Sequence, residues 1–276
     1  MNPTLSRRTG AVAIAAFVVL VCIVQLVPFY IALTTSLKQK TDLSSQLSFP
    51  TADIFFGNFM TAIADGGILR AMLNSVLVTG MSTLLVCVLG ALAAYPLARR
   101  ASLLNRGVLA IVVGLMMVPA LSILVPLYTL LADLRLLNTY VGVILVMTAT
   151  SLPVSVFLYA NFMRSLPLSV EEAGTLDGAN RLQVLCYILI PMLRPVTATV
   201  AILTGVGVWN EFALSGYILT TPETRTIAPA IASFFSIQSS NLPAATAASL
   251  LAVLPVIVAY LFLQKYFIRG ISGAEK

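Results

Sequence analysis

The sequence predicts an all-α membrane protein with six transmembrane helices. Of its 276 residues, 59% are hydrophobic and 9% are charged, and its mean hydropathy is +0.99. A soluble domain has about 25% charged residues, so most of this chain's surface must face lipid or another apolar partner. A spanning helix needs about 20 mostly apolar residues. Six stretches meet this length: 11–35, 72–98, 107–131, 140–162, 196–214 and 244–267.

The chain is expected to form one transmembrane domain over residues 1–276, because no long polar segment separates the apolar stretches. Its basic residues predict the orientation. With a cytoplasmic N-terminus, 11 of the 16 Lys and Arg residues fall in inner segments and five in outer segments. The positive-inside rule therefore predicts that both termini are cytoplasmic. The inner residues are Arg7, Arg8, Arg99, Arg100, Arg106, Arg164, Arg181, Arg194, Lys265, Arg269 and Lys276.

Composition also excludes several kinds of chemistry. The chain has no histidine, and none of its three cysteines lies in a C-x-x-C pair. Histidine metal sites and histidine proton relays are therefore absent, and no metal site is expected. None of the four lysines lies in the Gly-Lys-Ser/Thr sequence that cradles phosphates. This chain is expected to bind no cofactor, and any ATP must be bound by another chain. The basic excess indicates membrane topology and not nucleic-acid binding.

The most informative segment is the polar loop of about residues 164–194. Ser169 and Glu172 are three residues apart, which predicts a capping box at a helix start. Glu171 and Glu172 suit the positive end of that helix dipole. Asp177 and Gly178 then predict a stop and a turn. The first half of the loop is therefore expected to be a short cytoplasmic helix that ends at a turn.

The second half of this loop is predicted to be an amphipathic helix that leads back into the membrane. Prolines at 191 and 195 mark the return. Four apolar residues recur at a helical spacing and are expected to lie on roughly one face. They are Leu182, Leu185, Ile188 and Leu189.

This loop resembles the EAA loop of bacterial ABC importer permeases, whose pattern is E-A-A, three residues, G, nine residues and I-x-L-P. Residues 172–174 read Glu-Ala-Gly, Gly178 stands at the glycine, and Ile188 and Pro191 close the pattern at the right spacing. The sequence departs from the pattern twice, with Gly174 in place of the second alanine and Ile190 in place of leucine. Both are small steric changes that leave the spacing whole.

The resemblance extends along most of the chain. Segments 73–78 and 90–95 are similar to the second span of carbohydrate-uptake permeases, and segments 125–128 and 136–140 to the connection between their third and fourth spans. The Trp-Asn-Glu-Phe run at 209–212 resembles part of their fifth span. The group that it resembles most is the MalG-like permeases, which have six spans.

The resemblance implies a type I ABC importer permease in the bacterial cytoplasmic (inner) membrane. It implies three kinds of protein partner: a second, homologous permease as a heterodimer partner, two ATPase subunits that hold ATP-Mg, and an extracytoplasmic solute-binding protein that faces segment 217–242. It also implies a set of ATPase-coupling residues in the loop. These are Glu171, Glu172, Ala173, Gly174, Asp177, Gly178, Ile188 and Pro191.

Three residues of the fifth stretch are candidates for the substrate pathway. Glu211 is the one acidic residue within an apolar stretch, and a buried charge there marks a pathway or a paired group. Trp209 and Asn210 add an aromatic face and an amide, which suit a sugar. Two alternatives stay open: Trp209 as an interfacial anchor with Glu211 already solvated, and a packing contact with the partner permease.

The predicted function is import of a sugar or a sugar-like solute. Two alternatives remain at this point: an ion-coupled secondary transporter, and an ABC importer permease for a non-sugar solute such as glycerol phosphate. A membrane enzyme is disfavoured, because the sequence has no paired acidic motif, metal cluster or nucleophile–base set.

Overall fold

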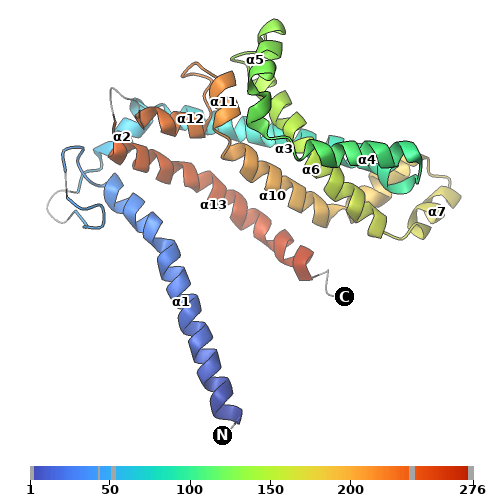
Figure 1. Cartoon of the computed structure of the whole chain (residues 1–276), viewed down its shortest axis with the longest axis horizontal. Helices are drawn as coiled ribbons and strands as arrows, with labels where there is room; N and C mark the ends of the chain where they lie inside the picture. Colours follow the sequence, from blue (N-terminus) through green and yellow to red (C-terminus); the bar gives the residue numbers. More distant parts are fainter. Residues whose placement is uncertain (1–2, 43, 51–53, 236–239, 273–276) are drawn as a thin grey trace. The chain divides into compact units, whose positions relative to one another are not determined.

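All regular elements in the described part of the chain are helices (Figure 1). The computed structural model describes residues 3–42, 44–50, 54–235 and 240–272, and the side chains of residues 14–42, 44–50, 54–235 and 240–262. The α-helices are α1 Pro3–Ser36, α2 Gly57–Ala64, α3 Ile68–Arg99, α4 Leu103–Leu115, α5 Leu124–Asp133, α6 Tyr140–Ser165, α7 Ser169–Leu176, α8 Arg181–Gln183, α9 Ile190–Met192, α10 Arg194–Trp209, α11 Ala213–Ile218, α12 Ile227–Ala232 and α13 Leu242–Ser272. The others are the 3-10 helices η1 Ala120–Ile123 and η3 Ser233–Phe235 and the π-helix η2 Val184–Leu189.

The number of membrane spans agrees with the sequence prediction when two bent pairs are counted as spans. Four described helices are long and apolar enough alone: Ile14–Ser36 within α1, then α3, α6, and Leu242–Phe262 within α13. Two further pairs are bent, by 94° between Leu103–Leu115 and Ala120–Asp133 and by 76° between Arg181–Met192 and Arg194–Trp209. If each bent pair is counted as one span, the described part of the chain has six candidate spans.

The continuous third and fifth spans that the sequence predicted are wrong in detail. The stretch 107–131 is interrupted between Leu115 and Ala120, where Pro119 adopts an extended backbone. Proline lacks an N–H group and disfavours a helical conformation in the residue before it, so the helix ends there. The stretch 196–214 is interrupted at residues 210–212, between α10 and α11.

The chain packs as two compact units, residues 1–68 with 231–254 and residues 69–230 with 255–276. Neither unit is one continuous stretch of sequence, and the expected single transmembrane domain over 1–276 stays a prediction. The predicted orientation also stays a prediction. The side chains of five basic residues on which it depends lie outside the described side chains. They are Arg7, Arg8, Lys265, Arg269 and Lys276.

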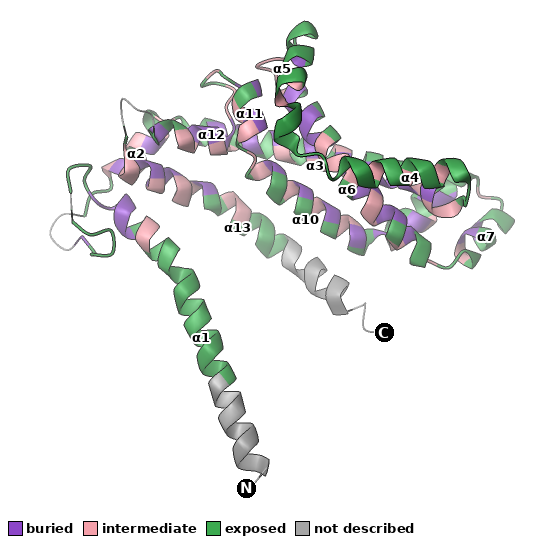
Figure 2. Cartoon of the chain, viewed as in Figure 1, coloured by how far each residue is buried: buried purple, intermediate pink, exposed green. Residues whose placement is uncertain are grey.

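In the first unit, the apolar surface of α1 is uncovered. Its side chains are exposed from Ile14 to Tyr30, as Figure 2 shows. A helix that is hydrophobic all round needs lipid or another chain to cover it.

The segment that follows the C-terminal end of α1 is held by polar contacts. Lys38 is 4% exposed, and its ammonium group donates to Ser44 Oγ, Ser45 O and Ser48 Oγ at 2.6–3.0 Å.

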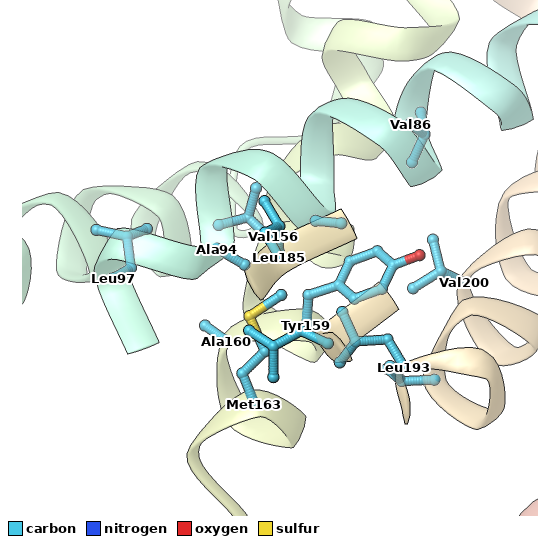
Figure 3. Packing of buried hydrophobic residues seen from close by; sticks show 13 residues of the cluster. Val86, Ala94, Leu97, Val156, Tyr159, Ala160, Met163, Leu185, Leu193 and Val200 are labelled. Atoms are coloured by element: carbon cyan, nitrogen blue, oxygen red, sulfur yellow. The ribbon is translucent and has the colours of Figure 1, made fainter. Parts of the chain in front are cut away.

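The second unit has a core that joins α3, α6, α10 and the loop between α7 and α10 (Figure 3). Tyr159 of α6 lies within it, 1% exposed, and its hydroxyl donates to Thr197 Oγ1 at 3.0 Å. The helices α3 and α6 approach closely at Gly90, where a Cβ atom would lie 2.0 Å from Ser155 Oγ. This core gives the polar loop a fixed base on three long helices.

Candidate functional site

The first half of the polar loop is the short helix α7, which projects beyond α6. It ends at Leu176, and Gly178 follows with a φ of +88°. Glycine adopts this left-handed backbone without the steric cost that a Cβ atom adds. The predicted stop and turn at Asp177 and Gly178 are confirmed.

The capping box predicted at Ser169 and Glu172 is wrong. Leu168 is the N-cap residue of α7, its backbone is already helical, and no side chain caps the helix. The loop has its capping box at α8 instead. Asn180 Oδ1 accepts from the backbone N–H of Gln183 at 3.0 Å, and Gln183 Oε1 accepts from the backbone N–H of Asn180 at 2.8 Å. The spacing Asn-x-x-Gln in the sequence was the signal for it.

The predicted single apolar face in the second half of the loop is partly wrong. Leu185 and Leu189 are buried and Ile188 is half-buried, but Leu182 is 64% exposed. Leu182 precedes the π-helix Val184–Leu189, whose wider turn changes the angle between successive residues. The ordinary helical period therefore does not carry the apolar face back to Leu182.

Gly174, the departure from the second alanine of the EAA pattern, packs closely on the second half of the loop. A Cβ atom on it would lie 2.3 Å from Ile188 Cδ1. Ile188 is itself one of the predicted coupling residues, so the two positions form one contact. The missing methyl group makes room for the end of the isoleucine side chain.

We expect Gly174→Ala to be tolerated. The atom in the way is the far end of a flexible side chain, and alanine favours the helix by about 1 kcal/mol over glycine. Solute uptake by the variant is expected to stay within about twofold of wild type, a difference of about 0.4 kcal/mol. Gly174→Leu is the control. Its side chain is too large for the space between residue 174 and Ile188, and this variant is expected to lose uptake. Equal loss in both variants would contradict the account of this contact.

Glu171 faces the interior of the second unit and anchors α7 to α3. Its Oε1 accepts from Arg99 Nε and its Oε2 from the Tyr95 hydroxyl at 3.1 Å. The side chains of Arg99 and Glu171 are 12% and 8% exposed. Arg99 Nη1 also donates to the carbonyl of Leu166 at 3.4 Å. The Arg99–Glu171 pair is the only ion pair among the residues whose side chains are described.

The other face of the loop is open. Glu172, Ala173, Asp177, Gly178 and Pro191 are exposed. The loop also has exposed apolar side chains outside the predicted coupling set. The most exposed of these are Leu176, 88% exposed, and Tyr187, 78% exposed. Apolar residues on a polar projection are the signal that could have found them, because such a surface is typical of a contact with another protein.

Trp209 and Asn210 lie on a groove of about 550 Å³ in the second unit, and Glu211 does not. The groove runs between α3, α10 and the part of α13 from Pro255 onward, and its lining is almost wholly apolar. Asn210 Nδ2 donates to the Val206 carbonyl at 2.9 Å. Its side-chain oxygen has no partner among the described residues, so Asn210 can offer an acceptor to the groove.

Glu211 stands in the break between α10 and α11 and caps α11. Its two carboxylate oxygens accept from the amides of Leu214 and Ser215, each at 2.7 Å. The positive end of a helix favours a negative charge at this position. The cost of an acidic residue in an apolar stretch is thus offset by two backbone hydrogen bonds and a local interruption of the helix.

Residues 86–273 match the family described as binding-protein-dependent transport system inner membrane component. The match covers more than half of the chain. The chain belongs to this family. The permease is 42% identical over 273 residues to the melibiose/raffinose/stachyose import permease protein MelC of Bacillus subtilis, covering 98% of this chain and 99% of that protein. It is 33% identical over 269 residues to the diacetylchitobiose uptake system permease protein NgcG of Streptomyces coelicolor, covering 96% and 88%.

The permease also has the fold of a chain in a solved importer. The match is to the crystal structure of a bacterial ABC transporter involved in the import of the acidic polysaccharide alginate, with a TM-score of 0.81, 22% identity, and coverage of 95% of this chain and 98% of that one. The predicted all-α fold of an ABC importer permease is confirmed.

Family membership establishes what kind of component this chain is. It is a multi-pass inner-membrane permease of a binding-protein-dependent ABC importer, and the catalytic ATPase is a separate subunit. An ATPase and a solute-binding protein are its partners. The alternative of an ion-coupled secondary transporter is overturned by this membership.

Proposed function

We propose that the permease imports a sugar. Support comes from relatives that match nearly the full chain, one named for melibiose, raffinose and stachyose and one for diacetylchitobiose. Trp209 and Asn210, which share the apolar groove, supply a ring face and an amide oxygen that suit the two sides of a sugar ring. In this proposal Glu211 holds α11 in place and does not contact the solute.

The proposed importer contains a second, homologous permease and two ATPase subunits that bind ATP-Mg. The solute-binding protein delivers solute to the outer segment, residues 217–242. The two permeases together form a pathway that alternates between outward-facing and inward-facing states. ATP drives this exchange because the closed ATPase pair binds one of the two states more tightly.

The coupling of ATP to transport is proposed to pass through the loop of residues 164–194. The observation that carries this step is the two-sided construction of α7. Glu172, Leu176 and Asp177 face outward, where an ATPase with a basic rim and an apolar pocket fits them. Glu171 faces inward onto Arg99 of α3. A movement of the ATPase against α7 therefore reaches α3, and the shared core carries it to α6 and α10.

Uptake by cells of the native host that lack this chain tests the solute class. We expect the deletion to abolish ATP-dependent uptake of radiolabelled raffinose or diacetylchitobiose and the wild-type chain to restore it. Glycerol 3-phosphate is the third probe. Uptake of both sugars that is unchanged by the deletion, with loss of glycerol 3-phosphate uptake, would overturn the sugar proposal and leave the permease assignment standing.

Trp209 gives the sharper test of the groove. Trp209→Ala is expected to lower sugar uptake about fivefold, because loss of one stacking ring costs about 1 kcal/mol, while Trp209→Phe retains most of the uptake. Phe212→Ala, which removes an exposed ring three residues away, is the control and leaves uptake near the wild-type rate. Equal uptake by Trp209→Ala and the wild type would remove Trp209 from the pathway.

A further inference from the structure

A second groove, of about 690 Å³, lies where the ends of α3, α4 and α6 meet in the second unit. Arginines from all three elements and the short connection between α3 and α4 line it. No acidic residue lines it. The residues with polar side chains in the lining are Arg99, Arg100, Asn105, Arg106 and Arg164.

Most of the positive charge of this groove is uncompensated. The charge of Arg99 is balanced by Glu171, but no described carboxylate pairs with Arg100, Arg106 or Arg164. All three are exposed. Arg164 Nη2 donates to the Leu97 carbonyl at 3.1 Å, which holds its guanidinium group at the groove wall. Three guanidinium groups at one groove favour an anion with several oxygen atoms, since each group is a fork of N–H donors.

The connection between α3 and α4, which carries Arg100, is held in place by side-chain hydrogen bonds. Ser102 caps α4, and its hydroxyl accepts a hydrogen bond from the backbone N–H of Asn105 at 3.1 Å. Asn105 Nδ2 then donates to the carbonyls of Pro96 at 2.8 Å and Arg100 at 2.9 Å. These bonds tie the start of α4 to the end of α3. Arg100 and Arg106 are thus attached to a fixed backbone, which lowers the entropy lost on binding.

The groove is amphipathic, and this points to the kind of anion. Leu97, Leu109 and Val113 also line it. Val113, 40% exposed, is seven residues from Arg106 and lies on the same face of α4, so the apolar part of the lining runs along this helix from the arginines. A soluble phosphate would match the arginines alone. A phospholipid matches both parts, with its phosphate on the guanidinium groups and an acyl chain along α4.

We propose that this groove binds the headgroup phosphate of an anionic phospholipid. The four arginines belong to segments predicted to face the cytoplasm, and basic pockets between helix ends on that side recognise anionic headgroups. The bound lipid fills the space between the ends of α3 and α6 and shields the arginines from one another. This inference depends on the position of the arginines in the membrane and not on which solute is imported.

Lipid titration of the full chain, purified with its partner chains in a neutral detergent, tests the proposal. Native mass spectrometry would count bound phosphatidylglycerol in the wild type and in Arg100→Gln/Arg106→Gln. The variant is expected to bind roughly tenfold or more weakly, because it removes two of the three guanidinium groups that no described carboxylate balances. Arg100→Lys/Arg106→Lys is expected to keep most of the binding. Phosphatidylcholine is expected to bind weakly to all of them.

A matched control removes the same charge elsewhere. Arg70→Gln/Arg135→Gln changes two exposed arginines that do not line the groove, and it is expected to leave lipid binding unchanged. Equal loss in this control would overturn the proposal in favour of a general charge effect. Displacement of phosphatidylglycerol by glycerol 3-phosphate at equal concentration would overturn it in favour of a soluble phosphate ligand. Thermal melting followed by far-ultraviolet circular dichroism checks that each variant is folded.

Discussion

Replacement of Glu171 by alanine is expected to abolish ATP-dependent uptake. It leaves the Arg99 guanidinium group, 12% exposed, without its carboxylate, and it also removes the acceptor of the Tyr95 hydroxyl. Loss of one partner of a buried ion pair costs about 3–5 kcal/mol, because the remaining charge is buried without compensation. We expect a large fall in the melting temperature of the detergent-solubilised importer and uptake below one tenth of the wild-type rate.

Two controls separate the role of Glu171 from a general effect of charge in the loop. Glu172→Ala changes the neighbouring carboxylate, which is exposed, and is expected to leave the melting temperature near the wild-type value. The exchanged pair Arg99→Glu/Glu171→Arg is expected to recover part of the stability that either single change loses. Normal uptake and melting in Glu171→Ala would contradict the role of the Arg99–Glu171 pair as the attachment of α7 to α3.

Replacement of Asn74 by alanine is expected to release the polar segment that follows α11 from α3. Asn74 Nδ2 donates to the carbonyls of Glu223 at 3.0 Å and Arg225 at 2.9 Å, and Asn74 Oδ1 accepts from the Tyr140 hydroxyl at 2.8 Å. Asn74 is 7% exposed. Each buried polar group left without a partner costs about 1–3 kcal/mol. We expect a loss of several kcal/mol in total, measured as a lower melting temperature and faster proteolysis at residues 220–227.

The controls for Asn74 depend on its donor group. Asn74→Asp keeps an acceptor for Tyr140 but sets a carboxylate against two carbonyl oxygens, so we expect it to be at least as unstable as Asn74→Ala. Ser82→Ala lies on the same helix, at a buried side chain whose hydroxyl has no partner among the described residues. It is expected to melt near the wild-type temperature. Wild-type stability in Asn74→Asp would show that the two donated bonds contribute little.

The long helices and the turn after α7 could be predicted from short stretches of the sequence, because each depends on the residues within it. The long apolar stretches predicted α1, α3, α6 and α13, because a membrane span depends on length and hydropathy. The turn at Asp177 and Gly178 was predictable because glycine tolerates its left-handed backbone. The spacing of the EAA pattern placed the loop within the chain and indicated the family.

The parts that could not be predicted depend on contacts between distant residues. Glu171 and Glu172 are adjacent, and nothing local shows that Glu171 turns inward, since its partner Arg99 lies 72 residues away. The break before Ala120 was equally hidden. Pro119 stands at a break between two helices, whereas Pro153 and Pro255 lie inside continuous helices. The presence of a proline alone therefore does not decide whether a helix breaks or continues.

The most direct test of the coupling loop is the accessibility of residue 176 to a membrane-impermeant maleimide. Leu176→Cys, in a chain with Cys22, Cys87 and Cys186 changed to serine, places one thiol on the exposed face of α7. We predict modification in inverted vesicles stripped of the ATPase, no modification in right-side-out vesicles, and protection when the ATPase is added back. Protection is expected to be lost in the Glu172→Arg variant. Modification from outside the cell, or labelling that the ATPase does not change, would contradict a cytoplasmic loop that docks on the ATPase.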